Sequence, residues 1–363
     1  MRNYRGGIVN PGNPGPLRNA LARAEAGNTL NLGFIGGSIT QGCNASCPEN
    51  NYVSRVCAWF AQRYPEVHYI NAGIGGTTSQ FAAARVQEDL LKYRPDIVFV
   101  EFSVNDENTP HYRETFEGLI RKILKSGAAA VVIHNVCYDT GASAQEMHLE
   151  IAKHYDLPAL SARETLYQFV LEKELDVRSI TEDDLHPNDL GHQMLAQLVI
   201  EFLENLPDGQ GSTGQLPSPL TENQYENSFR LDQRTACPVL RGFTPDPEPQ
   251  NRITQMFRHG YLGRSIGDSV FFHVSGSCIA VQYRKTIHKP APVALAILDG
   301  NEKDSWILDG NFEEDWGDCL YCQTLISHGE NKVRTLEIRI IHTSAEDASG
   351  FYLASVIQSS KEE

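Results

Sequence analysis

Four short segments of the sequence hold residues that suit acyl transfer. Ser38 follows two glycines in FIGGSITQGC, and Asp183 and His186 share the segment DDLHPN near the middle of the chain. A serine hydroxyl is a weak nucleophile unless a base removes its proton during attack, and an imidazole can serve as that base. A carboxylate on the other ring nitrogen fixes the tautomer and stabilises the imidazolium. We therefore predict a nucleophile at Ser38, a general base at His186 and its carboxylate partner at Asp183.

The other two segments, NAGIGGTTS and SVND, supply hydrogen-bond donors. A tetrahedral intermediate of acyl transfer needs donors that already point at its oxyanion. Gly76 offers an unobstructed backbone N–H, Asn105 a side-chain amide, and Ser38 its own N–H at the turn into a helix. We predict that these three groups form an oxyanion hole. Asp106 and His134 are candidates for the wall of the substrate pocket, with solvated-loop and structural roles as the alternatives.

Each of these residues also has an ordinary structural interpretation. A serine before a helix is a frequent N-cap, and a glycine or asparagine in a loop often serves only the turn. Asp184 adjoins Asp183, so the identity of the acid that orients His186 stays open. The occurrence of all four segments in one chain favours the catalytic interpretation, because a cap requires neither His186 nor Asn105.

Alternating strands and helices are expected to position these residues. Short apolar segments predict strands, and segments with apolar residues at spacings of three and four predict helices. The strands are expected at 30–36, 67–73, 96–102, 129–135 and 157–161, and the helices at 52–64, 79–93, 112–127, 145–155 and 190–206. This alternation indicates a parallel sheet covered on both faces. Ligands bind at the carboxyl ends of such strands, where Ser38, Gly76 and Asn105 lie.

The segments GGSITQG, NAGIGGTTS, SVND and DLHPN resemble, in this order, the four conserved blocks of the SGNH (GDSL-like) hydrolases. The resemblance covers about residues 30–205. It implies a flavodoxin-like three-layer αβα domain, and it matches Ser38 to the nucleophile, Gly76 and Asn105 to oxyanion donors, and His186 with Asp183 to the base and its partner. Two positions depart from the family pattern. Gly37 stands where an aspartate is usual, and Ser103 stands where a glycine is usual.

A change in composition predicts a second domain. We expect the hydrolase domain at 1–206, a Gly-, Ser- and Pro-rich linker at 207–222, and a second domain at 223–363. Short strands separated by turn residues, with no long helical pattern, indicate an antiparallel β-sandwich of the jelly-roll type. Glycan binding, cleft shaping and oligomerisation are all open roles for it, and we favour oligomerisation with partial shaping of the cleft.

The net charge and the cysteine content limit which classes of partner the protein can bind and in which cellular compartment we expect it. The 46 acidic and 31 basic residues give a formal net charge of -15, which repels nucleic acid and anionic membrane surfaces. The eight cysteines show no repeating spacing, which is typical of free thiols. The N-terminal segment has no apolar run of the kind a secretion signal needs, so we expect a cytoplasmic location. We expect a homo-oligomer, and neither a metal nor an organic cofactor.

The resemblance extends to substrate class. The GGSIT form together with a jelly-roll-like module is similar to bacterial acetyl esterases that act on xylan and related hemicelluloses. We therefore expect a serine esterase that removes acetyl groups from such oligosaccharides. No long apolar insertion for a lipid-binding lid separates the four segments, which favours a short acyl group. A lysophospholipase or thioesterase of the same fold is one alternative, and a carbohydrate-binding protein on a degenerate hydrolase platform is another.

Overall fold

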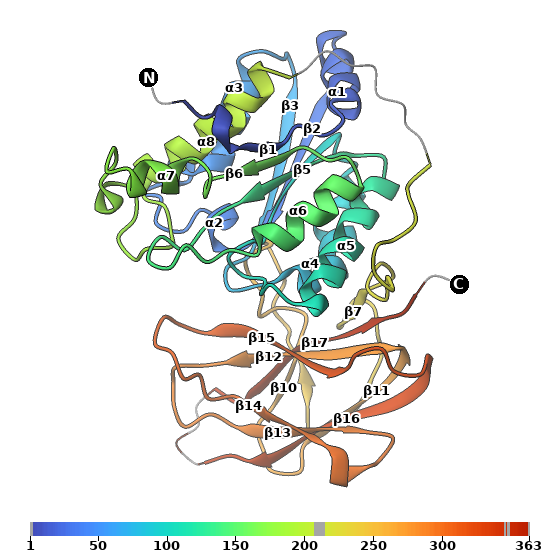
Figure 1. Cartoon of the computed structure of the whole chain (residues 1–363). Helices are drawn as coiled ribbons and strands as arrows, with labels where there is room; N and C mark the ends of the chain where they lie inside the picture. Colours follow the sequence, from blue (N-terminus) through green and yellow to red (C-terminus); the bar gives the residue numbers. More distant parts are fainter. Residues whose placement is uncertain (1–2, 207–214, 345, 347–348, 362–363) are drawn as a thin grey trace. The chain divides into compact units, whose positions relative to one another are not determined.

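The computed structural model describes residues 3–206, 215–344, 346 and 349–361 and divides into two compact units, Met1–Asn223 and Gln224–Glu363. The first unit is built on a six-stranded sheet in the order β1-β6-β5-β4-β2-β3 (Figure 1). The parallel strands are β2 (Leu30–Gly36), β3 (Val67–Gly73), β4 (Ile97–Glu101), β5 (Ala129–His134) and β6 (Ala159–Ser161). Strand β1 (Ile8–Asn10) joins β6 in the antiparallel direction. The order of the parallel strands is that of flavodoxin-like folds.

Helices cover both faces of this sheet. One face is covered by α1 (Gly15–Glu25), α3 (Tyr52–Ala61) and α8 (Asp189–Glu204), whose apolar residues share one core cluster with the strands. The opposite face is covered by α4 (Ser79–Asp89), α5 (Pro110–Lys125) and α6 (Gln145–His154) (Figure 1). The short helix α7 (Leu166–Leu171) follows β6. Strands β4 and β5 are buried along their whole length, as expected for strands covered on both sides, and the predicted three-layer αβα domain is confirmed.

The second unit is a sandwich of two antiparallel sheets (Figure 1). One sheet has the order β15-β12-β17-β10-β9, with β7 also paired to β17. Its strands are β15 (Cys319–Ile326), β12 (Cys278–Lys285), β17 (Phe351–Ser359), β10 (Tyr261–Gly263), β9 (Thr244–Pro245) and β7 (Phe229–Leu231). The other sheet has the order β14-β13-β16-β11-β8, formed by β14 (Trp306–Asp309), β13 (Val293–Leu298), β16 (Lys332–His342), β11 (Ser269–Gly276) and β8 (Val239–Arg241). Apolar side chains of both sheets form one core cluster, which confirms the expected all-β domain.

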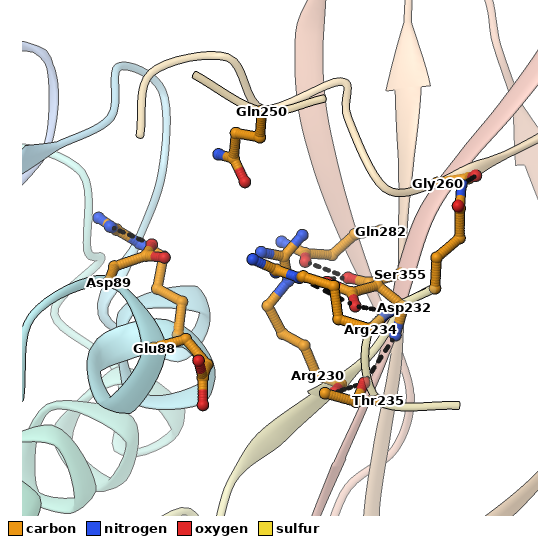
Figure 2. Close-up of polar contacts among 12 residues, drawn as sticks. Glu88, Asp89, Arg230, Asp232, Arg234, Thr235, Gln250, Gly260, Gln282 and Ser355 are labelled. Carbon is orange, nitrogen blue, oxygen red and sulfur yellow. Dashed lines mark hydrogen bonds and ion pairs between the residues drawn. The ribbon is translucent and has the colours of Figure 1, made fainter. Parts of the chain in front are cut away.

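Polar side chains tie the short strand β7 to its sheet. Arg230 Nε donates to Ser355 Oγ at 3.3 Å, and Ser355 Oγ donates to Gln282 Oε1 at 2.7 Å (Figure 2). The carboxylate of Asp232 holds Arg234 through an ion pair of 2.5 Å (Figure 2). The bond from Arg230 to Ser355 thus adds to the ladder that β7 forms with β17.

The segment before the second unit is docked on the first. Of the predicted linker 207–222, residues 207–214 lie outside the described part of the chain. The carboxylate of Glu117 in α5 accepts from the backbone N–H groups of Leu220 at 2.7 Å and Thr221 at 2.8 Å. Arg121 donates to the carbonyl of Pro217 at 2.9 Å. These bonds hold the chain from Pro217 to Thr221 against α5. Within the described residues, no helix is both long enough and apolar enough to cross a membrane.

Candidate active site

The turn that carries Ser38 is tightly enclosed. Strand β2 ends at Gly36, and the short helix α2 (Ser38–Gln41) begins two residues later. A Cβ atom on Gly36 would lie 2.2 Å from Thr40 Oγ1, and one on Gly37 would lie 2.1 Å from Asn105 Oδ1. Real Cβ atoms do not approach other atoms so closely, so both positions require glycine. An aspartate at position 37 would require the Asn105 side chain to shift from its present position.

Three of the predicted residues form one hydrogen-bonded chain. His186 Nε2 lies 2.8 Å from Ser38 Oγ, and His186 Nδ1 lies 2.6 Å from Asp183 Oδ2. A carboxylate accepts only, so Nδ1 carries the proton and Nε2 is left as the acceptor for the serine hydroxyl. Ser38 is 8% exposed, whereas the His186 side chain is 23% exposed. The structure thus brings the nucleophile, base and acid proposed from the sequence into bonding contact.

Asp183 is held in place by its own loop. Its Oδ1 accepts from the backbone N–H groups of His186 at 2.7 Å and Leu185 at 3.1 Å, and from Thr181 Oγ1 at 3.1 Å. Partial burial by itself raises the pKa of Asp183. Hydrogen bonds from the side chain and backbone of His186 outweigh this effect and lower the pKa to about 2. The carboxylate is therefore ionised at any pH well above 2, and its Oδ2 stays directed at the imidazole.

Asp184, the alternative orienting acid, has a different partner. Its Oδ2 forms an ion pair with Arg178 Nη2 at 2.5 Å, and its backbone lies in the left-handed region with φ of 61°. That backbone conformation turns the two neighbouring carboxylates apart. The structure places Asp183, and not Asp184, on His186.

Bonds between the Ser38 loop and helix α8 fix the distance between Ser38 and His186. Asn188 caps α8 by accepting from the N–H groups of Leu190 and Gly191, both at 3.1 Å. The carboxylate of Asp189 accepts from the backbone N–H and the hydroxyl of Ser46, at 2.8 and 2.6 Å. His192 Nε2 bonds the carbonyl of Cys43 at 3.0 Å. The contacts of Asp189 and His192 were not predicted from the sequence. Both residues lie within four positions after DLHPN, and this closeness to the catalytic segment was the available signal.

The three predicted oxyanion donors have no competing acceptor. Among the residues that the structure describes, nothing accepts from the backbone N–H of Ser38, the backbone N–H of Gly76 or the Nδ2 amide of Asn105. Gly76 has φ of 66°, a conformation that favours glycine, and Gln41 Oε1 holds the neighbouring Gly75 N–H at 2.6 Å. The Oδ1 of Asn105 is buried against Gly37, which leaves Nδ2 to donate elsewhere. All three groups are thus available to an oxyanion.

Ser103, the second departure from the family pattern, connects two strand ends. Its hydroxyl accepts from the backbone N–H of Asn135 at 2.7 Å and donates to the carbonyl of Asn135 at 3.2 Å. These bonds tie the loop that carries Asn105 to the end of β5.

Asp106 and His134 are both buried, so the structure supports the structural alternative for His134, and Asp106 is neither a solvated loop acid nor an exposed pocket wall. The Asp106 side chain is fully buried, where Oδ1 accepts from the backbone N–H of Ser79 at 2.9 Å and Oδ2 bonds His148 Nε2 at 3.0 Å. His134 is fully buried and stacks on His148, with ring centroids 6.0 Å apart. Burial lowers the pKa of His134 well below its usual range, so the ring is neutral. Both residues have structural roles, because helices α5 and α6 cover this end of the sheet.

The contact between Gly37 and Asn105 gives a double-mutant prediction. Asn105→Ala is expected to lower kcat about 10²- to 10³-fold, the usual cost of one lost oxyanion donor. Gly37→Ala is expected to lower kcat in the same direction, because its Cβ displaces Asn105. The double variant is expected to lose no more than Asn105→Ala alone, since both changes act on one donor. Kinetics with an aryl acetate measure this.

Gly6→Ala is the matched control for that experiment. A Cβ on Gly6 meets its nearest atom at 3.5 Å, an ordinary contact, so kcat is expected to stay at the wild-type value. Losses that multiply in the double variant would mean that Gly37→Ala acts on a group other than Asn105.

Comparisons with known proteins agree with this geometry. Residues 34–194 match the model of the GDSL-like lipase/acylhydrolase family. Two crystal structures of a two-domain esterase (CEX) active on acetylated mannans are each 46% identical to this chain and cover 100% of it. Their TM-scores are 0.96, for the structure with mannopentaose, and 0.97, and the match covers 99% and 100% of those chains. The acetylxylan esterase of Geobacillus stearothermophilus is 26% identical over 208 residues, which is 48% of this chain and 94% of that protein.

The first relative is similar along the whole chain, and the second along 48% of it. An identity of 46% over the whole chain, together with the four catalytic segments in the family's order, establishes membership. The chain belongs to the GDSL-like lipase/acylhydrolase family, and it is a two-domain carboxylic ester hydrolase.

Proposed function

We propose that this protein is a serine esterase that removes acetyl groups from acetylated hemicellulose oligosaccharides. The observation that carries the proposal is the chain of hydrogen bonds from Asp183 through His186 to Ser38, at 2.6 and 2.8 Å. This arrangement activates a hydroxyl for attack on an ester. The free N–H of Gly76 and the free amide of Asn105 support it, because acyl transfer develops an oxyanion next to the nucleophile.

The proposed reaction proceeds through an acyl-enzyme. Ser38 Oγ attacks the acetyl carbonyl carbon while its proton moves to His186 Nε2. The three donors stabilise the oxyanion, and His186 then gives the proton to the leaving sugar oxygen as the ester C–O bond breaks. A water molecule then gives a proton to the same nitrogen and attacks the carbonyl carbon of the acetyl-serine. As the bond from that carbon to Ser38 Oγ breaks, His186 returns the proton to Oγ, and acetate leaves. Asp183 stays ionised throughout and stabilises the imidazolium.

Mannan-derived oligosaccharides are the substrate class that we place first. The two-domain relative active on acetylated mannans is similar over the whole chain, whereas the acetylxylan esterase is similar over about half of it. Acetylated xylo-oligosaccharides come second. Acetate release from the two oligosaccharide classes, at matched acetyl concentration, tests this order, and a higher kcat/KM on the xylan-derived class would reverse it.

A series of aryl esters with acyl chains of two to ten carbons separates this proposal from a lysophospholipase or thioesterase activity. The largest kcat/KM is expected for the acetyl ester, with a decline of about tenfold or more by eight carbons, because a small pocket rejects added methylenes. A maximum at about eight carbons or beyond would favour the lipid-type alternative, since each buried methylene then adds binding energy.

We further propose a cytoplasmic homo-oligomer. The cytoplasmic location is supported by the eight cysteines, all of which are free thiols. Fractionation of the producing cell tests it, and activity in the culture medium would contradict it. The oligomer is proposed as the role of the second domain, together with partial shaping of the cleft. Light scattering of the full chain and of a chain ending near residue 206 tests this, since an unchanged mass would exclude it.

A further inference from the structure

A carboxyl group is buried directly behind the Ser38 turn. Glu101 is the last residue of β4 and pairs in register with Gly36, the last residue of β2. Glu101 is 1% exposed, and the reaction proposed above does not use it. A buried acid is costly unless hydrogen-bond donors surround it. The groups around Glu101 therefore indicate what it does.

Thr40 connects Glu101 to the helix that begins with Ser38. Thr40 Oγ1 donates to Glu101 Oε2 at 3.3 Å, and the Tyr52 hydroxyl lies 2.9 Å from Thr40 Oγ1, where it can donate in turn. The backbone carbonyl of Thr40 accepts from Asn71 Nδ2 at 2.7 Å. Thr40 is fully buried and lies two residues after Ser38 in α2. Its bonds thus fix the position of the short helix.

The second oxygen of the Glu101 carboxyl group is less well satisfied than the one that Thr40 bonds. Glu101 Oε1 and Asn135 Nδ2 are both buried, and neither has a partner at hydrogen-bonding geometry among the described residues. Burial raises the pKa of Glu101 to about 7, whereas the Asn135 side chain, the Thr40 hydroxyl and the Gly37 backbone N–H lower it. The Thr40 hydroxyl is the one of these groups that bonds the carboxyl group at a short enough distance, through Oε2 at 3.3 Å.

The turn has no free space through which it can shift. A Cβ on Gly36 would lie 2.2 Å from Thr40 Oγ1 and 2.6 Å from the Glu101 carbonyl oxygen. A Cβ on Gly37 would lie 2.1 Å from Asn105 Oδ1. A displacement of Thr40 is therefore passed to Gly36 and from there to Ser38, because packed groups do not deform independently.

From this geometry we infer that Glu101 is a positioning residue for the nucleophile. It holds Thr40, so that Ser38 Oγ, two residues earlier in α2, stays within 2.8 Å of His186 Nε2. Glu101 does not touch the substrate. The inference rests on the proposed role of Ser38, and it adds a carboxylate from β4 as the support of the turn.

Glu101→Gln tests the inference. Glutamine keeps the size of the side chain but directs an NH₂ group at donors, so the turn shifts. The expected result is a kcat about 10- to 100-fold lower on an aryl acetate, with KM within about two-fold of wild type, because a small misplacement of a nucleophile costs rate and not binding. Phosphonylation of Ser38 by a 4-nitrophenyl phosphonate ester is expected to slow by the same factor. Wild-type values of kcat and phosphonylation in the folded variant would overturn the inference.

Glu117→Gln is the matched control. Glu117 is also fully buried and also accepts several hydrogen bonds, but from Tyr155 at the end of α6 and from Leu220 and Thr221 of the docked segment. The control is expected to lower Tm and leave kcat and the phosphonylation rate unchanged. An equal loss of kcat in Glu117→Gln would mean that any buried acid affects the rate through general stability, and the specific role of Glu101 would be overturned.

A pair of Thr40 variants decides the matter where Glu101→Gln does not fold. Thr40→Val removes the hydroxyl that binds Glu101 at nearly constant volume, whereas Thr40→Ser keeps it. The serine variant is expected to recover most of the kcat that the valine variant loses, with about tenfold between the two. Equal kcat in the two variants would overturn the inference.

The phosphonate also separates this inference from the proposed function. Labelling of wild-type Ser38 without acetate release from any acetylated oligosaccharide would reject the proposed substrate and leave Glu101 testable. An unlabelled wild-type Ser38 would reject the proposed nucleophile itself.

Discussion

Ser38→Ala is expected to lower kcat on an aryl acetate by about 10⁴- to 10⁶-fold, with a folded protein and a Tm near that of wild type. The loss is large because the acyl-enzyme no longer forms, and the residual rate comes from binding and the oxyanion donors alone. Ser38 is 8% exposed, and among the described residues its hydroxyl bonds only to His186. The His186 side chain is 23% exposed, so water can bond its Nε2 when the hydroxyl is removed, and the variant is expected to stay folded.

Ser126→Ala is the matched control for this variant. The Ser126 hydroxyl donates to the carbonyl of Ile123 at the end of α5, at 2.6 Å, and lies at the opposite end of that helix from the loop of Asn105. Its kcat is expected to equal that of wild type. Hydrolysis of the aryl acetate at the wild-type rate by Ser38→Ala would remove the proposed mechanism, and a carbohydrate-binding role on a degenerate platform would then become the better account.

The sequence predicted the sheet and the nucleophile turn well because both follow from local patterns. In the segments DIVFVEF and AAVVIHN, the residues that point to either face of a strand are mostly apolar. The structure accordingly buries β4 and β5 on both faces. The glycines before Ser38 indicated a tight turn, and Gly36 and Gly37 indeed have no room for a Cβ. Asp183 and His186 lie three residues apart on one loop, so their contact required no tertiary information.

The features that the sequence did not predict depend on the register between paired strands and on which helices cover the edge of the sheet. Glu101 lies behind Ser38 because β2 and β4 pair with Gly36 opposite Glu101, and a register is not visible in either strand alone. Asp106 and His134 were misplaced because a polar residue at a strand end is expected to face the ligand edge. Here His148 of α6 lies against both of them, and the edge is closed at that point.

The shortest elements were missed for a different reason. Strands β1, β7 and β10 have three residues each, which is too few to show a period of two, and unlike β6 they were not predicted from a longer apolar segment. Helix α1 follows a segment rich in proline and glycine, which favours a loop interpretation. These elements owe their structure to partners far along the chain, as β1 does to β6.

Asp183→Asn is expected to lower kcat by about 10³- to 10⁴-fold while KM changes little, because the imidazole adopts the wrong tautomer. The geometry fixes the direction of the new amide. Oδ1 of residue 183 accepts from the N–H groups of Leu185 and His186, so the amide oxygen stays there and the NH₂ group faces His186 Nδ1. Nδ1 must then accept, the ring proton moves to Nε2, and Nε2 no longer accepts the Ser38 proton.

The same carboxylate makes a pH-dependent contribution to stability. The pKa of Asp183 is lowered to about 2 in the folded protein, below its usual value of 3.8. A lowered pKa means that the stabilisation is fully present above pH 3.8 and is lost as the pH falls towards 2. Between these values the free energy of unfolding of wild type is expected to fall more steeply than that of Asp183→Asn, and denaturant titrations at several pH values measure the difference.

Asp184→Asn distinguishes the role of Asp183 from a general effect of acidic charge near His186. It removes an equal charge one residue away, but its carboxylate pairs with Arg178 at 2.5 Å, and the Arg178 side chain is 52% exposed. An exposed ion pair contributes little to stability, so kcat is expected to stay within about two-fold of wild type. A loss in Asp184→Asn as large as that in Asp183→Asn would show that charge near the imidazole matters and the tautomer does not. In that case the summed negative charge of the loop, and not the hydrogen bond from one carboxylate, would account for the effect on His186.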